Sequence, residues 1–473
     1  MRILLVNPSI RQEKTGHYDP GIERARGSYP SLGLLYIAAV LREKGHDVRV
    51  FDMDAEREPK RKLAELIDNF EPPVIGIHVM TWTFHQADEI ARFVKKKNPK
   101  TVLIAGGAAV TSMPEAFMKY SAFDFGVIGE GEETVVELAD AICRNRDMRG
   151  IKGIIFRASN DIIKNPSRPF IENLDTVPAP ARNLVRLERY YDVFTARSRF
   201  ATVVTSRGCP YKCVYCDRTN RMGHRWRSFP NARIVEEIKE LKDFYKIDEI
   251  MFFDDEFVTD PHKTMELCEM ISGSGLDVVW ECRARVDVVT PGLLKAMKKA
   301  GCYRIRYGFE SGDDGILGVL KKDITVKQSL ACAEMTKDAG IEIFGYFMLG
   351  CPSETDKTME KTLKLALEID PEFAVFSKVM LIPGSQLFDW AVSKKLVAPD
   401  YWDRFFAGNA GNRTPTISTK DLPEERVDAF IRMANKKFYS RPGFIMKKLS
   451  KIRGISQLTR QARMGISLLL ANK

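Results

Sequence analysis

Residues 201–216 read Ala-Thr-Val-Val-Thr-Ser-Arg-Gly-Cys-Pro-Tyr-Lys-Cys-Val-Tyr-Cys, a strand-forming run that leads into a loop with three cysteines. The cysteines are Cys209, Cys213 and Cys216, so their spacing is Cys-x3-Cys-x2-Cys. Three thiolates this close can bind three irons of a [4Fe–4S] cubane and leave the fourth iron without a protein ligand. The motif predicts such a cluster. The alternative is a structural zinc site, which usually takes a fourth protein ligand, and His224 is the only nearby candidate.

The cysteine motif resembles, residue by residue, the signature of the radical S-adenosylmethionine (SAM) family, including the aromatic Tyr215 directly before the last cysteine. The resemblance implies that SAM chelates the open iron and that Tyr215 belongs to the SAM site. An electron from the cluster would break a carbon–sulfur bond of SAM and release a 5′-deoxyadenosyl radical. In such sites the cofactor carries the chemistry, while the protein supplies position and shielding.

Repeating strand–helix units follow the motif and predict a partial (β/α)6 barrel. The expected strands lie near residues 202–205, 249–253, 278–282, 304–309, 342–349 and 374–381. In such barrels the chemistry lies at the carboxyl ends of the strands. Polar groups gather at these ends, namely Asp254-Asp255-Glu256, Arg283 and Arg285, Glu310-Ser311-Gly312, and Gly350-Cys351-Pro352-Ser353-Glu354.

The family resemblance implies roles for these strand ends. The acidic group with Asp254 and Asp255 would hold the SAM amino group, and Arg285 would meet the SAM carboxylate. Glu310 would lie near the ribose, with Ser311 beside it in the SAM site, and the last two strands would pack on adenine. Each residue alone could instead be an ordinary cap or ion pair, so the ordered series is the stronger signal. Four further cysteines within helical or strand patterns are expected to be small core residues, namely Cys268, Cys282, Cys302 and Cys332.

Residues 1–150 alternate between short β-branched runs and amphipathic helical patterns. The apolar runs lie at 3–6, 48–51, 74–79, 102–105 and 125–128. Nearly continuous apolar strands separated by helices predict a parallel sheet covered on both faces, in a doubly wound, flavodoxin-like α/β domain. Ligands of such sheets bind at the carboxyl ends of the strands. A dinucleotide site is not favoured, because Asn7-Pro8 follows the first strand in place of Gly-x-Gly-x-x-Gly.

Several N-terminal stretches resemble the cobalamin-binding domain of the B12-dependent radical SAM family, among them Tyr-Pro-Ser-Leu-Gly-Leu-Leu-Tyr-Ile-Ala-Ala at 29–39 and Val-Ile-Gly-Glu-Gly-Glu at 127–132. The resemblance implies cobalamin contacts from residues at the helix start and the strand ends, namely Ser31, Thr81, Gly106, Gly107, Gly129, Glu130 and Gly131. Many cobalamin domains supply a lower axial histidine from Asp-x-His-x-x-Gly after the first strand. Here that loop reads Thr15-Gly16-His17-Tyr18-Asp19-Pro20. We therefore expect cobalamin to bind without a histidine ligand, and His17 to be a surface residue.

The length of 473 residues predicts two or three domains, and 44% apolar with 29% charged residues is typical of globular chains. Prolines at 166, 169, 178 and 180 place a linker at 151–198, which begins with a hairpin around 159–161. We thus expect a cobalamin-binding domain at 1–150, the barrel at 199–408 and a helical basic region at 409–473.

The positive charge is confined to the end of the chain. From Arg432 to Lys473 there are eleven Lys or Arg and no Asp or Glu, so the rest carries about 10 − 11 = −1 of the net +10. A local basic tail argues against a nucleic-acid-binding protein. The helical pattern at 444–470 fits a helix packed on the barrel or a basic amphipathic helix on an anionic membrane surface, and both remain open.

Cobalamin beside a SAM cluster leads to our main functional hypothesis. One SAM would methylate reduced cobalamin, and a second would give the radical. The methyl group would then be transferred to an unactivated carbon of a small-molecule, lipid or tetrapyrrole-like substrate. The second hypothesis is a cobalamin-assisted cyclase or oxidative enzyme, similar to the anaerobic Mg-protoporphyrin monomethyl ester cyclase. A tRNA methylthiotransferase fits poorly, since only Cys143 is available for a second cysteine set. A non-catalytic cobalamin or metal sensor conflicts with an intact cysteine motif.

The remaining expectations concern partners and location. Cluster reduction calls for an electron donor such as flavodoxin or ferredoxin. No run of about 18 apolar residues predicts a membrane span, and the start of the chain lacks a cleavage site, so we expect a cytoplasmic enzyme with peripheral membrane contact as an option. No residue is assigned to radical quenching or proton removal.

Overall fold

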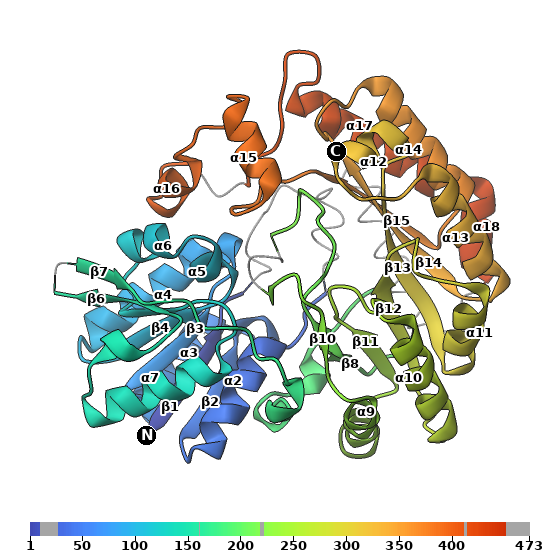
Figure 1. The fold of residues 1–473 in the computed structure, drawn as a ribbon. Coiled ribbons are helices and arrows are strands. Elements are labelled where there is room, and N and C mark those ends of the chain that lie inside the picture. Colours follow the sequence, from blue (N-terminus) through green and yellow to red (C-terminus); the bar gives the residue numbers. More distant parts are fainter. Residues whose placement is uncertain (10–26, 160, 218–221, 411–413, 451–473) are drawn as a thin grey trace.

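The computed structural model describes residues 1–9, 27–159, 161–217, 222–410 and 414–450, and it places two sheets opposite one another (Figure 1). The N-terminal sheet has seven strands in the order β2-β1-β3-β4-β5-β6-β7. Its parallel part is the flavodoxin-like order, as predicted. The strands are β1 (Arg2–Asn7), β2 (Asp47–Asp52), β3 (Val74–His78), β4 (Val102–Gly106), β5 (Phe125–Val127), β6 (Ile154–Ala158) and β7 (Asp161–Lys164).

Alternation along the first strand produces two separate cores. Leu4 and Val6 belong to the core on one face, which includes side chains of α3, α4 and α6. Ile3 and Leu5 belong to the core on the other face, which includes side chains of α2 and α7. The sheet is therefore covered on both sides, as a run of apolar strands requires. The helices are α2 (Leu32–Glu43), α3 (Pro59–Phe70), α4 (Phe84–Lys97), α5 (Ala108–Ser112), α6 (Pro114–Tyr120) and α7 (Glu132–Arg144).

The predicted hairpin forms, and the structure adds a feature that the sequence did not indicate. The strands β6 and β7 are antiparallel, and β6 pairs with β5, so the hairpin extends the N-terminal sheet. The proline-rich residues that follow form short 3₁₀ turns, including η4 (Leu174–Thr176), η5 (Arg182–Leu184) and η6 (Leu187–Arg189). Earlier turns of this kind are η1 (Met53–Ala55), η2 (Thr81–Thr83) and η3 (Met148–Gly150).

The second sheet is the predicted partial barrel. Its six strands are all parallel and follow one another in chain order, from β8 at one edge to β15 at the other. The strands are β8 (Phe200–Val203), β11 (Glu249–Phe252), β12 (Val279–Ala284), β13 (Cys302–Glu310), β14 (Glu342–Leu349) and β15 (Phe373–Lys378). The four cysteines expected in the core are each 1% exposed or less and pack in the barrel's main apolar cluster.

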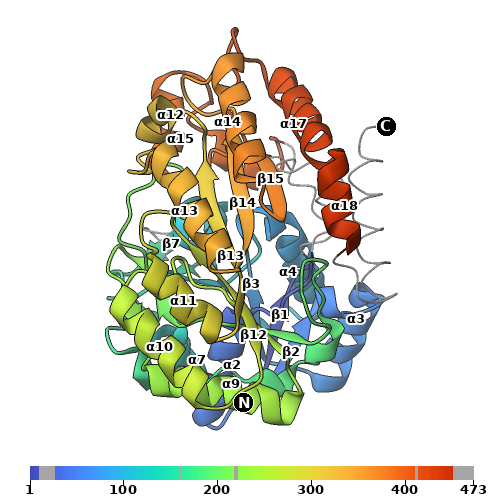
Figure 2. The same ribbon diagram turned by 90° about the vertical axis from the view of Figure 1, so that its right-hand side faces the viewer.

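Helices line the outer face of the barrel (Figure 2). They are α9 (Asn231–Tyr245), α10 (Pro261–Gly273), α11 (Pro291–Lys299), α12 (Asp314–Val319), α13 (Val326–Asp338) and α14 (Asp356–Ile369). After the last strand, α15 (Gln386–Ser393) and α16 (Tyr401–Phe406) return to the N-terminal half. There Phe406 meets Phe84 of α4 with ring centroids 4.5 Å apart, so one apolar cluster spans both halves.

The C-terminal region is helical, as predicted. α17 (Glu424–Tyr439) packs on the edge strand β15, where the Tyr439 hydroxyl donates to the Ala374 carbonyl at 2.7 Å. α18 (Pro442–Ser450) follows, while the rest of the expected basic helix and His17 lie outside the described residues. Among the helices of the described part, none has the length and apolar character that crossing a membrane requires.

Candidate active site

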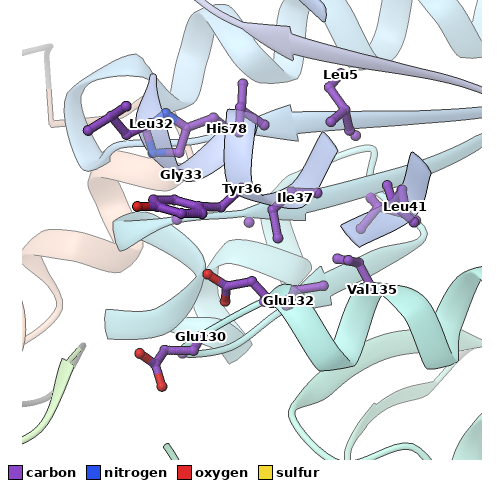
Figure 3. Close-up of a pocket in the computed structure, with 18 of the residues that line it drawn as sticks. Leu5, Leu32, Gly33, Tyr36, Ile37, Leu41, His78, Glu130, Glu132 and Val135 are labelled. Carbon is purple, nitrogen blue, oxygen red and sulfur yellow. The ribbon is translucent and has the colours of Figure 1, made fainter. Parts of the chain in front are cut away.

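A cavity of about 320 Å³ lies at the carboxyl ends of the N-terminal strands, where they face the barrel (Figure 3). At one end, apolar side chains of Leu5, Leu41 and Val135 line a slot between the sheet and helices α2 and α7. At the other end the lining includes the polar side chains of His78 and Glu132 beside Leu32 and Tyr36. The barrel half contributes residues of its own to this wall, namely Val204, Ser206, Arg207, Met222, Phe253 and Asp255.

Glycines give the cavity a bare backbone wall. Around Gly33, Gly106 and Gly129, the position of an added Cβ has no heavy atom within 4 Å, so these residues border open space. Gly107 has φ +112°, and a Cβ there would meet the Val79 carbonyl oxygen and the His78 ring at 2.8 Å. A wall of this kind allows a large ligand to lie against the backbone. The cavity therefore suits a bulky group with an apolar appendage that enters the slot.

Five of the seven residues expected to contact cobalamin line this cavity, namely Gly106, Gly107, Gly129, Glu130 and Gly131. The other two are described but are not among the lining residues. Ser31 is the N-cap residue of α2, and Thr81 is buried in the 3₁₀ turn that precedes α4. Their predicted contacts remain predictions.

A buried cluster of four charges joins the cavity to the cysteine loop. Glu130 accepts from Arg207 Nη1 at 3.0 Å and from Arg227 Nη1 at 2.8 Å, and Glu132 accepts from Arg207 Nη2 at 2.6 Å. All four side chains are 9% exposed or less. We call Glu130, Glu132, Arg207 and Arg227 the interdomain clamp. The Glu130 carboxylate is thus engaged by protein, and it borders the cavity as part of this clamp.

The clamp arginines lie at the two ends of the cysteine loop. Arg207 is in β9 (Ser206–Arg207) and Arg227 is in β10 (Arg227–Ser228), and these two short strands pair in antiparallel fashion. Asp254, fully buried at the end of β11, fixes the entry to the loop. Its carboxylate accepts from the Thr205 backbone N–H at 3.0 Å and from the hydroxyls of Thr205 at 2.8 Å and Ser206 at 2.5 Å. Asp254 therefore holds the loop, and its partners are protein groups.

The three cysteines of the motif are half-buried free thiols. Burial raises the pKa of the Cys209 thiol, and the neighbouring Cys216 and Cys213 raise it further. In the part of the chain that the structure describes, no three His, Cys, Asp or Glu side chains converge on one metal-ion position. A cubane needs no such convergence, because each thiolate binds a different iron. The donor set and its clustering fit a [4Fe–4S] group.

Arg285 of the sequence prediction lies against the cysteine loop. Its guanidinium stacks on the Tyr211 ring at 3.9 Å and lies 4.0 Å from Cys213 Sγ. It also pairs with Asp287 at 2.9 Å. Glu256, after β11, is buried beside the same loop, and burial raises its pKa to about 7. A cation and a carboxyl group thus flank the cysteine loop.

Tyr215 and Glu310, which were both predicted for the SAM site, contact each other. The Tyr215 hydroxyl donates to Glu310 Oε1 at 3.1 Å, and Lys322 Nζ donates to the same oxygen at 3.0 Å. Burial alone would lower the pKa of Lys322, but Glu310 and Cys213 raise it, so the ammonium is retained beside the thiols. Glu310 has φ +61° at the end of β13, a conformation that costs energy for a residue with a side chain.

Ser311 has a different environment from its predicted neighbours. It is fully buried, its hydroxyl lies 3.3 Å from the Thr362 hydroxyl of α14, and it accepts from the Asp313 backbone N–H at 3.2 Å. Asp255 lines the cavity described above, between the two halves. The structure thus brings Tyr215, Arg285 and Glu310 to the cysteine loop, places Asp255 toward the cavity, and turns Ser311 toward a helix.

Several residues of this region escaped sequence reasoning, namely His78, Arg207, Arg227 and Lys322. Arg207 precedes Cys209 by two residues, so its closeness to the motif was a usable signal. The others had no local signal, because their partners lie far away in the sequence; Lys322 meets Tyr215 across 107 residues.

Comparisons with known proteins agree with this geometry. Residues 19–139 match the B12 binding domain, and residues 203–366 match the Radical SAM superfamily. An uncharacterized methyltransferase of Pyrococcus horikoshii is 33% identical, over 98% of this chain and 99% of its own length. The anaerobic magnesium-protoporphyrin IX monomethyl ester cyclase of Rubrivivax gelatinosus is 27% identical, over 82% of this chain and 69% of its own length. The methyltransferase TsrM of Kitasatospora setae, solved with cobalamin and a [4Fe–4S] cluster, has a TM-score of 0.77 with 18% identity over 99% of both chains, so it supports the fold.

Proposed function

The chain belongs to the B12-binding radical SAM family and is a cobalamin-dependent radical SAM enzyme. We propose that it transfers a methyl group to an unactivated carbon of a small-molecule, lipid or tetrapyrrole-like substrate. The observation that carries this proposal is the cavity itself, whose wall combines the glycine-rich strand ends of one half with Phe253 and Asp255 of the other. A cofactor held in this space borders both the N-terminal strand ends and the half of the protein that carries the cysteine loop.

When bound, the cluster supplies the electron that cleaves SAM, and cobalamin supplies a carrier for the methyl group. The protein's own residues orient and shield these groups. The SAM carboxylate is assigned to Arg285, and its position next to Cys213 supports this assignment. Asp255 and Glu256 are the acids available for the SAM amino group, whereas Asp254 acts through the loop that it fixes. Tyr215, Glu310 and Lys322 form the wall assigned to the ribose side.

The glycines are assigned to cobalamin. Gly106 and Gly129 leave the backbone open to a flat macrocycle, and Gly107 lines the same wall. The apolar slot between the sheet and helices α2 and α7 is assigned to an aromatic appendage. The interdomain clamp keeps this wall next to the cysteine loop, since four buried charges that pair with one another hold a defined geometry.

A radical cyclase or oxidative enzyme without net methyl transfer is the second candidate. The relative named as a magnesium-protoporphyrin ester cyclase favours it, because the similarity extends over 82% of this chain. The two candidates differ in their products, since one gains a methyl group and the other loses hydrogens. A reduced flavodoxin or ferredoxin is the proposed electron donor for either.

The test begins with anaerobic purification, reconstitution with iron, sulfide and hydroxocobalamin, and removal of unbound cofactor. Retained cobalamin and 5′-deoxyadenosine are then quantified with SAM and reductant. The Cys213→Ala variant should lose deoxyadenosine formation, whereas Cys332→Ala, which alters a buried core thiol of the barrel, should retain it. Transfer of deuterated methyl from labelled SAM to candidate lipids and tetrapyrroles separates methylation from cyclisation. Deoxyadenosine formation without retained cobalamin would contradict methyl transfer by this route.

A further inference from the structure

The strand β12 and the residue that follows it carry charged side chains in alternate positions, namely Glu281, Arg283 and Arg285. The residues between them pack in the barrel's main apolar cluster, which includes side chains of the outer helices, so the charged side chains point to the interior. Glu281 pairs there with Arg306 at 2.5 Å, and Arg285 reaches Cys213 of the cysteine loop. Arg283 therefore lies inside the barrel, between a buried ion pair and the residues assigned to SAM.

Arg283 has an aromatic ring on one side and a second cation on the other. The centroid of the Phe253 ring lies 4.5 Å from the guanidinium carbon of Arg283. On the next strand, Arg306 is the direct register partner of Arg283. The charge of Arg306 is offset by Glu281 and by Asp192, whose carboxylate is 3.7 Å away. Within the described part of the chain, by contrast, no ion pair or side-chain hydrogen bond engages the Arg283 guanidinium.

The N–H donors of Arg283 are therefore available to a ligand. A cation–π contact leaves them without an oxygen acceptor, and their planar fork matches two oxygens of a carboxylate or phosphate. Arg283 is half-buried, so an anion bound there would be partly shielded from water, which strengthens the hydrogen bonds. Phe253 also lines the cavity assigned to cobalamin. Arg283 thus lies between this wall and the residues assigned to SAM, where the substrate of methyl transfer has to bind.

We propose that Arg283 binds an anionic group of the substrate, a carboxylate or a phosphate, and thereby selects acidic substrates. This inference rests on the proposed function and narrows its substrate class to small molecules, lipids or tetrapyrroles that carry an acid group. The SAM carboxylate has a separate cation, because Arg285 is two residues nearer to the strand end, about 7 Å along an extended strand. A neutral substrate would leave the half-buried guanidinium of Arg283 without a counter-charge, which is the physical basis of the selectivity.

The test is modification of arginine side chains by phenylglyoxal in the reconstituted full-length protein without SAM. Mass spectrometry identifies the modified residues, and fragment ions separate Arg283 from Arg285. At constant ionic strength, inorganic phosphate or propionate should slow the modification of Arg283 along a saturation curve, by about tenfold at about ten times the Kd of the anion, because only the free site reacts. The matched control is Arg144, an exposed residue of α7 that pairs with Asp140, whose rate should not change. The anion that protects at the lower concentration distinguishes a carboxylate from a phosphate substrate.

A second measurement separates the substrate from SAM. Arg285→Gln should raise the KM for SAM in deoxyadenosine formation more than Arg283→Gln does, because the SAM carboxylate is assigned to Arg285. An equal rise in the two variants would assign Arg283 to SAM and overturn the inference.

Each result of the modification experiment also decides. An Arg283 that does not react cannot be reached by a ligand, and an Arg283 that neither anion protects binds no acid group; either result overturns the inference and leaves the proposed function intact. Protection of Arg283 in an enzyme whose product gains no methyl group would overturn the proposed function instead, and the anion site would belong to the substrate of the second candidate. If Arg283→Gln fails to fold, the wild-type protein still decides, because its modification depends on no variant.

Discussion

The interdomain clamp allows a quantitative prediction for Glu130→Ala. The Glu130 side chain is 3% exposed and accepts from Arg207, Arg227 and the Ile171 backbone N–H. After the substitution Arg207 keeps Glu132, whereas among the described residues Arg227 keeps the carbonyl oxygens of Ile171 and Met222 and the face of the Phe170 ring, 5.2 Å away. Within the described part of the chain, this buried cation is then left without a carboxylate partner.

Removal of one partner from a buried ion pair costs about 3–5 kcal/mol, because the remaining charge stays out of water. For an unfolding unit of about 150–250 residues, 1 kcal/mol lowers Tm by about 2–4 °C, so Tm should fall by at least about 6 °C. The matched control is Glu133→Ala, whose carboxylate is 57% exposed and lies 3.2 Å from Arg168. Exposed pairs contribute about 0–1 kcal/mol, so this change should lower Tm by less than about 4 °C.

The assay is thermal unfolding of the reconstituted proteins by circular dichroism under anaerobic conditions. The double variant Glu130→Ala/Arg227→Met should recover part of the loss, because it leaves no unpaired buried cation. Glu130→Ala should also release cobalamin faster than the control, since Glu130 borders the cavity. Equal Tm values for Glu130→Ala and Glu133→Ala would refute the assignment of the clamp as a buried, paired group.

Three further outcomes are expected. Gly106→Ala should reduce retained cobalamin, because its Cβ would enter the open space of the cavity assigned to cobalamin, whereas Gly273→Ala in α10, where the Cβ also meets open space but no cavity, should not; equal retention in dialysis would contradict this reading of the glycine wall. Cys209→Ala should lose the visible absorption of the iron–sulfur cluster together with deoxyadenosine formation. An unchanged absorption spectrum would remove Cys209 from the ligands of the cluster. Burial raises the pKa of Glu249 from 4.5 to about 7, so the folded state binds more protons than the unfolded state and its stability falls as pH rises through this window. The free energy of unfolding of Glu249→Gln should therefore rise by about 3 kcal/mol relative to that of the wild type between pH 4 and pH 8. Parallel profiles of Tm against pH for the two proteins would contradict this prediction.

Much of this protein could be predicted from local sequence. Cys209, Cys213 and Cys216 are close together in the chain, so their spacing alone predicts a cluster with an open iron. Apolar runs of strand length alternate with amphipathic helices, and this pattern predicts both parallel sheets. The glycines of the cavity were identified because they follow strands, and in parallel sheets the carboxyl ends of strands lie at one edge.

The roles of the strand-end side chains required the tertiary structure. Asp254 looked like a ligand-binding acid, yet it holds Thr205 and Ser206, about 50 residues earlier. Ser311 turns to a helix for the same reason, since a buried polar group takes whatever partner packing brings to it. Neither partner has a fixed offset in the sequence, so no periodicity can report it.

The distance in sequence between interacting residues also separates what the sequence determined from what the tertiary structure decided in the whole molecule. By itself the sequence determined which elements form, which of their faces are apolar, and that three thiolates share a loop, because these properties depend on neighbours within a few residues. The packing of two halves decided that Glu130 and Glu132 meet Arg207 and Arg227, and that His78 joins Asn7 and Asp52 at the wall of the cavity. These contacts join residues 45–97 positions apart, and only the fold brings such positions together.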